Sequence, residues 1–292
     1  MPLNIKIFAH RGGPAKAPEN SLHAFAQCIE DGASGFECDV CLTKDREPVI
    51  LHKEITRDTI FDATLKNIPL SSLTFKDLAR FRIKNSNEPI PHLDEVLDFV
   101  ESCPQCECFL EPKQASKELI EIIVQKIQKR NLLNRVALIT FFARKNMLMY
   151  ARTLSSHIRI CPIFIPLATI FSEALCLKGA EKQRFPTKVD TQTRNDRIAV
   201  KPLLISPTFN FARAAHKLGA KVCTVALPRK TGRKAMPIFS RLFSQRIQAL
   251  KKRGIRVNAG LVENEKDIAW LLRHGIHEFW TDNVPRIAES VN

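Results

Sequence analysis

The sequence lacks acidic side chains over one long segment. From residue 197 to 262 there is not one Asp or Glu, while fifteen Lys and Arg residues fall there. The whole chain of 292 residues has 45 basic and 30 acidic side chains, so everything outside this segment, with 30 of each sign, is neutral. A local positive charge on a neutral body argues against a uniformly cationic nucleic-acid coat protein. It favours a surface that meets phosphates or anionic lipid.

The chain also lacks an apolar run long enough to cross a bilayer. The stretch 158–177 is interrupted by Arg, Pro, Ser and Glu, so it falls short of the ~20 apolar residues that a spanning helix needs. Residues 3–8 alternate apolar and polar side chains instead of following the basic-then-apolar order of a signal peptide. We therefore expect a cytoplasmic protein. Because repeats, low-complexity tracts and linkers are absent too, we expect a single domain over residues 1–292.

Nine cysteines, an odd number, are scattered through mostly apolar stretches. Reduced and buried thiols are the expected state. The cluster Cys103-Pro-Gln-Cys106-Glu-Cys108 also suggests a structural zinc site, but no second Cys or His pair follows at a suitable spacing.

Short β-like runs alternate with segments whose apolar residues recur every three or four positions. Helices are expected at 21–30, 93–100, 116–128, 209–217 and 265–273, with Ser21, Ser116 and Asn264 as start signals. The alternation favours a parallel α/β fold, and its length suits a (β/α)₈ TIM barrel, in which polar residues at the carboxyl ends of strands carry the chemistry. One or two of ten candidate strands must then be extra: 5–9, 35–41, 48–52, 107–111, 135–140, 158–163, 203–206, 221–226, 255–258 and 278–281.

The first two candidate strands end in groups that suit an anion site and a cation site. His10 and Arg11, followed by two glycines, could bind an anion, although a capping or surface histidine is equally open. Glu37 and Asp39 are two apart and share a strand face, while Cys38 points away. Two carboxylates on one face resist joint ionisation unless a cation lies between them, and oxygen ligands suit Mg²⁺ or Ca²⁺. Two solvated acids on an edge strand are the alternative.

The next two candidate strands end in His52 and in Glu111 with Lys113. Each alone would be ordinary, a structural histidine and a surface ion pair. Together the four strand ends supply two acid/base groups, three carboxylates for a metal and two cations for a phosphate. Phosphodiester cleavage needs this set, because the phosphate must be neutralised while one oxygen loses a proton and another gains one.

At these residues the sequence resembles the glycerophosphodiester phosphodiesterase family. The matching pieces occur in family order over residues 5–140 and again over about 253–285, and their joint occurrence makes the match specific. They are His10-Arg11-Gly12, Pro18-Glu19-Asn20-Ser21, residues 35–40, Thr43-Lys44-Asp45, Val49-Ile50-Leu51-His52, residues 91–97, Leu110-Glu111-Pro112-Lys113, Thr140-Phe141 and residues 275–282.

The resemblance implies a TIM barrel with a small insertion between residues 53 and 90. It implies one divalent cation, Mg²⁺ or Ca²⁺, on Glu37, Asp39 and Glu111. It also implies His10 and His52 as general acid and base, in an order left open, with Arg11 and Lys113 on the phosphate. The implied reaction is hydrolysis of a glycerophosphodiester to sn-glycerol 3-phosphate and an alcohol.

The chain departs from the family pattern near the expected substrate pocket. Lys53 stands where the family has Asp after its second histidine, and residues 260–264 lack the family's aromatic residue. Trp280 could refill that space or could be an aromatic residue of the barrel core. The segment 143–252, which holds most of the basic region, matches poorly.

Three functional hypotheses follow. The first is a metal-dependent phosphodiesterase with a small-molecule or lysolipid substrate. The second is a lysophospholipase D type of enzyme at a membrane surface, with a peripheral contact to anionic lipid through residues 229–256, where apolar residues and cations share an amphipathic pattern. In that pattern the apolar stripe could equally pack on the barrel. The third is a non-enzymatic barrel that binds an anion; nucleic acid is not the expected partner.

Overall fold

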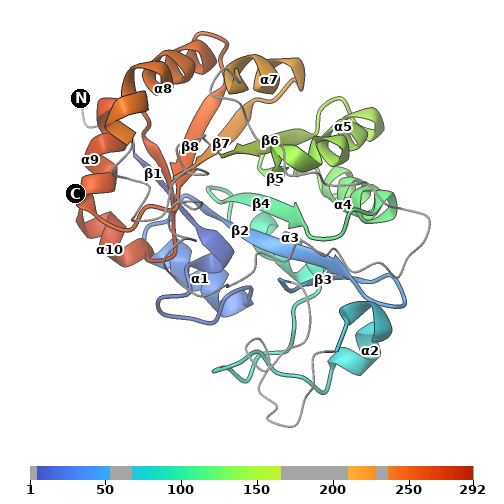
Figure 1. Ribbon diagram of the computed structural model, residues 1–292. Coiled ribbons are helices and arrows are strands. Elements are labelled where there is room, and N and C mark those ends of the chain that lie inside the picture. Colours follow the sequence, from blue (N-terminus) through green and yellow to red (C-terminus); the bar gives the residue numbers. More distant parts are fainter. Residues whose placement is uncertain (1–4, 53–67, 166–209, 228–235, 292) are drawn as a thin grey trace, which may run out of the picture.

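Eight parallel strands form a closed barrel in the computed structural model, which describes residues 5–52, 68–165, 210–227 and 236–291 (Figure 1). Each strand pairs with the next, and β1 pairs with both β2 and β9, so the sheet closes on itself. The predicted (β/α)₈ barrel is confirmed. Its strands are β1 (Lys6–Ala9), β2 (Gly35–Leu42), β4 (Glu107–Pro112), β5 (Val136–Phe141), β6 (Arg159–Phe164), β7 (Val222–Ala226), β8 (Arg256–Gly260) and β9 (Glu278–Thr281).

Helices cover the outside of the barrel (Figure 1). The predicted start signals are confirmed: the side chains of Ser21, Ser116 and Asn264 each accept a backbone N–H of the first helical turn. The helices are α1 (Leu22–Glu30), α3 (Leu93–Ser102), α4 (Lys117–Lys129), α5 (Lys145–Leu154), α7 (Phe211–Lys217), α8 (Met236–Lys251), α9 (Glu265–Arg273) and α10 (Val284–Glu289), with short 3₁₀ turns η1 (His10–Gly12), η2 (Leu70–Ser72) and η3 (Phe142–Arg144).

One candidate strand is extra. The segment predicted at 48–52 forms β3 (Pro48–Ile50), which pairs antiparallel with β2 outside the barrel. The candidate at 203–206 lies outside the described residues. The described part of the insertion, residues 68–90, contains α2 (Phe75–Leu78) and shares a small core of its own with β2 and β3. The buried side chains of that core are Cys41, Val49, Leu51, Leu70, Leu73, Leu78, Phe81 and Ile90.

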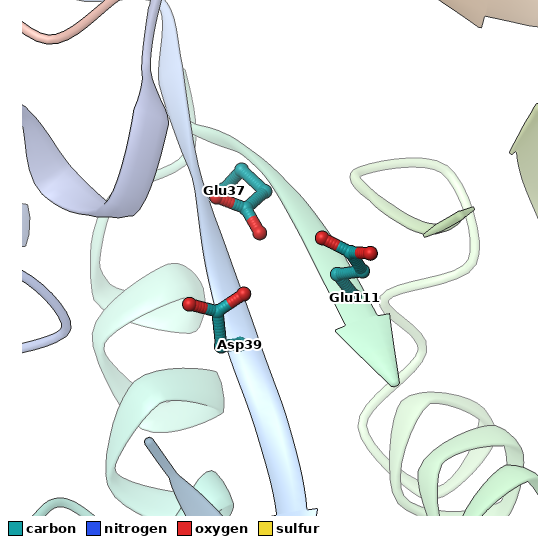
Figure 2. Close-up of side chains that lie close together, drawn as sticks. All are labelled: Glu37, Asp39 and Glu111. Carbon is teal, nitrogen blue, oxygen red and sulfur yellow. The ribbon is translucent and has the colours of Figure 1, made fainter. Parts of the chain in front are cut away.

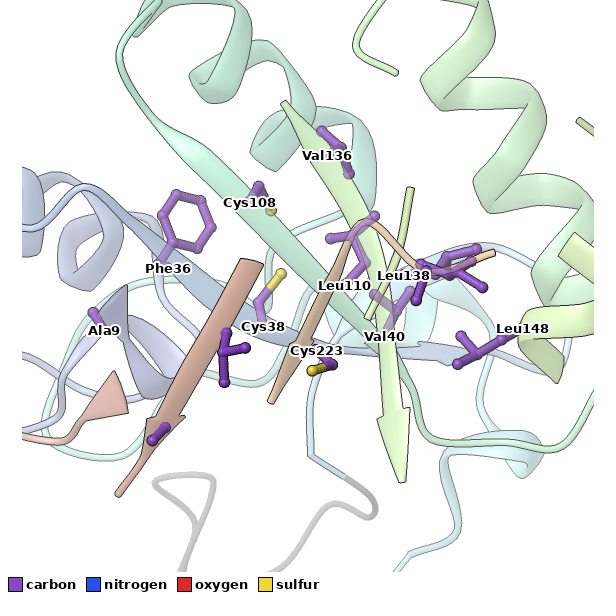
Figure 3. Close-up of a cluster of buried hydrophobic side chains, with 14 of the residues drawn as sticks. Ala9, Phe36, Cys38, Val40, Cys108, Leu110, Val136, Leu138, Leu148 and Cys223 are labelled. Atoms are coloured by element: carbon purple, nitrogen blue, oxygen red, sulfur yellow. The ribbon is translucent and has the colours of Figure 1, made fainter. Parts of the chain in front are cut away.

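The alternation of β2 and β4 separates an apolar face from a polar one. Cys38 and Val40 of β2 and Leu110 of β4 point outward into the core beneath the helices (Figure 3). Inside the barrel, the Trp280 ring lies 5.0 Å from those of both Phe8 and Phe109, and Trp280 is only 4% exposed. Trp280 is therefore an aromatic residue of the barrel core.

Where its side chains are described, helix α8 packs on the outside of the barrel. Phe243, Ile247 and Leu250 are buried, and the Phe243 ring lies 4.9 Å from that of Trp270 in α9. The apolar stripe at these positions therefore packs on the protein, which was one of the two alternatives for this segment. Among the described helices, none combines the length and the apolar character needed to cross a membrane.

The eight described cysteines are free and buried, as expected. Burial raises the pKa of Cys28, Cys41 and Cys161 to about 12, which keeps these thiols protonated. Over the described ranges, the side chains that gather in a possible metal-binding group are all carboxylates, so the cysteine cluster at 103–108 forms no such site there.

A cluster of ion pairs lies at the amino-terminal end of the barrel. Glu107 of β4 accepts from Lys6 of β1 at 2.9 Å, from Arg159 of β6 at 2.7 Å and from Arg256 of β8 at 2.9 Å. Burial alone would raise the pKa of Glu107, but these hydrogen bonds lower it to about 2. One carboxylate thus ties together three strands that are far apart in the sequence.

Replacing this carboxylate is expected to destabilise the barrel. The change Glu107→Gln leaves three neighbouring cations without their shared anion and should lower the free energy of unfolding by about 2–3 kcal/mol at pH 7. A depressed pKa stabilises the fold above the ordinary value near 4.5 and loses that effect as the pH falls towards 2. In urea unfolding, the difference between wild type and variant should therefore be much smaller at pH 3 than at pH 7. A constant difference would contradict this account.

Candidate active site

Three carboxylates meet near the carboxyl ends of β2 and β4. Glu37 and Asp39 share the inward face of β2, and the register between the strands places Asp39 beside Glu111. All three side chains are buried, and each offers an oxygen within 4.8 Å of the others (Figure 2). The sequence predicted this set, and the structure brings it together.

Asp39 is held from three sides. Asn20 donates its amide to Asp39 Oδ2 at 2.9 Å and accepts the Asp39 backbone N–H at 3.1 Å. Arg11 Nε lies 3.0 Å from Oδ2, and Lys113 Nζ lies 2.6 Å from Oδ1. Burial alone would raise the pKa of Asp39, but the charges of Lys113 and Arg11 hold it below its ordinary value. Asp39 is therefore a fixed carboxylate.

Glu37 is held less completely. Its Oε2 accepts the Arg11 backbone N–H at 3.2 Å, but its buried Oε1 has no hydrogen-bond donor. Burial and the neighbouring charge of Asp39 raise the pKa of Glu37 to about 8. A buried acceptor without a donor, inside a group of carboxylate oxygens, fits a hard divalent cation such as Mg²⁺ or Ca²⁺.

The turn after β1 brings Arg11 to these carboxylates. Arg11 adopts a left-handed conformation at φ 52°, and Gly12 follows at φ 84°. A Cβ on Gly12 would come within 2.7 Å of the Ala24 side chain, so only glycine fits between this turn and α1. The tight turn aims the Arg11 N–H at Glu37, while its guanidinium reaches Asp39 and Glu19.

His10 lies between two acids. Its Nδ1 donates to Asp282 Oδ1 at 2.7 Å, and its Nε2 lies 3.9 Å from Glu37 Oε2. Burial lowers the pKa of His10, but the hydrogen bond to Asp282 and the charge of Glu37 outweigh it and raise the pKa above its ordinary value. Because Asp282 fixes Nδ1 as a donor, Nε2 is the nitrogen turned towards the carboxylates.

His52 follows the antiparallel strand β3, which lies outside the barrel. The N–H of its neighbour Leu51 donates to the Asp39 carbonyl at 3.0 Å, which holds this segment against β2. His52 is partly buried there. Lys113, predicted to bind phosphate, lies against the carboxylates, with Nζ 2.6 Å from both Asp39 and Glu111.

Two further residues belong to this site. The sequence placed Asn20 only before a helix start and within a family motif, yet it is 3% exposed, has φ 60° and contacts Asp39 through both amide atoms. Asp282 follows the last strand and meets His10 across the β1–β9 pairing. Both lie in pieces that match the family, residues 18–21 and 275–282, and Asp282 also directly follows a candidate strand.

Comparison with known proteins adds a family to this geometry. The sequence profile described as the glycerophosphoryl diester phosphodiesterase family matches residues 10–286. The chain belongs to this family. The matched range includes every residue of the site described above.

Individual relatives of the family match over shorter segments. A glycerophosphodiester phosphodiesterase of Caldanaerobacter subterraneus is 36% identical over 100 residues, which is 34% of this chain and 41% of the relative. Human glycerophosphodiester phosphodiesterase 1 is 39% identical over 101 residues, 32% of this chain and 29% of the relative. These matches therefore span less than half the length of either relative.

Solved structures of the family share the fold over nearly the whole chain. The glycerophosphodiester phosphodiesterase of Thermotoga maritima has a TM-score of 0.64 at 17% identity, with 98% of this chain and 97% of that chain covered. An Oleispira antarctica phosphodiesterase, solved in complex with the product sn-glycerol-3-phosphate, has a TM-score of 0.67 at 16% identity, with 98% and 96% covered. At this identity the likeness concerns the fold.

Proposed function

We propose that this protein hydrolyses glycerophosphodiesters to sn-glycerol 3-phosphate and an alcohol, with one divalent cation bound at Glu37, Asp39 and Glu111. The observation that carries the proposal is the group of three buried carboxylates beside His10, in which Glu37 Oε1 has no hydrogen-bond donor. Family membership supports the reaction class. A phosphodiesterase of the same fold was solved in complex with the product sn-glycerol-3-phosphate, which supports this compound as the product expected here.

The charges of the site argue for the cation. The raised pKa of Glu37 shows that burial and the charge of Asp39 oppose ionisation of all three carboxylates. When all three are ionised they outnumber the two cations, Arg11 and Lys113, and the cluster alone would repel an anionic phosphodiester. A divalent cation, Mg²⁺ or Ca²⁺, reverses that balance. When bound, it neutralises the phosphate and polarises its oxygens. Arg11 and Lys113 would neutralise the remaining charge of the phosphate. Both lie against the carboxylates and therefore next to the proposed cation and its substrate.

Two histidines divide the proton transfers in this proposal. Asp282 orients His10 so that Nε2 faces the carboxylate cluster, where it can take or give a proton. His52, at the start of the insertion, serves as the second group. One histidine removes the proton of the attacking oxygen and the other protonates the leaving alkoxide. The pH–rate profiles of the two single variants would show which histidine is the general acid and which is the general base.

The proposal is tested by sn-glycerol 3-phosphate release from glycerophosphocholine. Release is expected with Mg²⁺ or Ca²⁺ and should be lost in EDTA. The variant His52→Ala should lower kcat/KM by about a hundredfold or more, because positioned acid/base groups contribute at least that much. The matched control is His157→Ala, an exposed histidine at the other end of the barrel, which should be unaffected.

If the folded protein released no sn-glycerol 3-phosphate with any of these metals, the proposal would be wrong. The non-enzymatic anion-binding barrel would then be the remaining hypothesis. Release of choline from lysophosphatidylcholine, without activity on glycerophosphocholine, would support the lysophospholipase D alternative instead.

A further inference from the structure

Cations gather at the end of the barrel opposite the carboxylates. Helices run antiparallel to the strands of such a barrel, so the last turns of α7, α8 and α9 lie at the amino ends of the strands, far from the catalytic end. We call the exposed cations there the basic end: Lys217, Lys221, Lys251, Lys252, Arg253 and Arg273.

Short contacts place these segments side by side. The Arg256 N–H at the start of β8 donates to the Lys221 carbonyl at 2.9 Å. Lys251 Nζ lies 3.0 Å from where a Cβ on Gly275, just after α9, would stand. The Arg152 guanidinium near the end of α5 lies 3.2 Å from the same position on Gly219, just after α7. In Figure 1 the helices α7, α8 and α9 follow one another around this side of the barrel.

Among the described residues, nearby acidic side chains do not neutralise this positive charge. Helices α5, α7 and α8 contain no Asp or Glu, and the carboxylates of α9 lie in its first turn, at the catalytic end. Glu278 is at the basic end, but both of its oxygens are engaged by Arg256, at 2.9 and 2.8 Å. Exposed acids such as Glu30 and Glu289 end α1 and α10, which follow α9 around the barrel and lie on the side away from α5 and α7 (Figure 1).

An exposed apolar side chain favours a lipid surface over a nucleic acid. Leu154, the last residue of α5, is 37% exposed and lies in the same last turn as Arg152. An exposed leucine gains nothing on a phosphate backbone, whereas it can insert beneath lipid headgroups. Cations in the last turn of a helix interact favourably with the helix macrodipole. Lys221, Lys252 and Arg253 come after the helices, so the macrodipole does not fully account for them.

We propose that the basic end, with Leu154 at its edge, docks the protein on an anionic phospholipid membrane. The docking itself goes beyond the proposed function, whereas its consequence rests on it. With the basic end on the bilayer, the carboxylate site at the other end opens towards water. The enzyme would then act on soluble glycerophosphodiesters near the membrane and not on lysolipids embedded in it.

Co-sedimentation with vesicles tests the docking. The protein should pellet with vesicles of phosphatidylcholine and phosphatidylserine, but not with phosphatidylcholine alone, and salt should weaken the binding. The triple variant K251Q/K252Q/R253Q should partition about a hundredfold less, since each cation near an anionic surface contributes to partitioning. The matched control K44Q/K76Q/K266Q removes three exposed cations elsewhere and should bind as wild type does.

A second variant separates insertion from charge alone. Leu154→Ser should leave binding at low salt nearly intact and weaken the residual binding at high salt. Equal losses in the two triple variants, no preference for anionic vesicles, or tighter binding to duplex DNA than to vesicles would each overturn the proposal. Because vesicle binding needs no substrate, its failure leaves hydrolysis of glycerophosphocholine unaffected, and the two proposals fail separately.

Discussion

The variant Asp39→Asn is expected to lose hydrolysis of glycerophosphocholine almost completely, with kcat/KM at least about ten-thousandfold lower. Asp39 sits at the centre of the site: Arg11 and Lys113 both pair with it, and Glu111 lies beside it across the strand register. Converting it to an amide removes an oxygen anion from the cation site, and the charge stabilisation lost with the cation amounts to several kcal/mol.

A metal titration distinguishes this result from damage to the fold. Calorimetry with Mg²⁺ or Ca²⁺ should show binding to the wild type and a large loss of affinity in Asp39→Asn. The control Asp98→Asn makes the same chemical change on α3, where the side chain is 64% exposed, and should retain both activity and binding. Full activity in Asp39→Asn would show that the carboxylate cluster holds no catalytic cation.

The largest expected effect on stability is at Gly35. A Cβ there would stand 1.9 Å from the carbonyl oxygen of Glu107, and that oxygen belongs to the neighbouring strand. Backbone cannot yield as a flexible side chain does, so Gly35→Ala must push β2 and β4 apart where their pairing begins. We expect a loss of at least about 3 kcal/mol in the free energy of unfolding, measured in urea.

The control is Gly32→Ala, three residues earlier, in the turn between α1 and β2. A Cβ at Gly32 meets nothing within 4 Å, so only its φ of 94° opposes the substitution, at a cost of about 1–2 kcal/mol. Similar losses in the two variants would show that strand spacing at Gly35 is not the cause. If Gly35→Ala remains folded, the shifted pairing of Asp39 with Glu111 should also lower its affinity for Mg²⁺.

The sequence predicted the barrel and its carboxylates because both depend on local pattern. Residues two apart on a strand share a face whatever the tertiary structure, so Glu37 and Asp39 could be placed together before the fold was known. Helix caps are equally local, which explains why Ser21, Ser116 and Asn264 were found. Glu111 was predicted in the same way, from the end of another candidate strand, and the family resemblance then implied that it shares one cation with Glu37 and Asp39.

The remaining features depend on pairings between distant segments. A short apolar run such as 48–50 looks the same in a barrel strand and in an antiparallel extra strand, because periodicity carries no information on direction. Asn20 resembles an ordinary helix start until β2 is placed beside it. The partners of Glu107 come from three other strands, and Asp282 gains its function only through β1. Sequence spacing alone contains none of these contacts.

The pairing of β1 with β9 also sets when the site becomes complete. His10 and Asp282 are 272 positions apart, and they meet only because the first and last strands are neighbours. A chain emerging from the ribosome makes the carboxylates of β2 and β4 early but leaves His10 without its orienting partner. Closure of the barrel by its final strand is thus the event that orients this histidine. A nascent or carboxyl-terminally truncated chain would have the three carboxylates without an oriented His10.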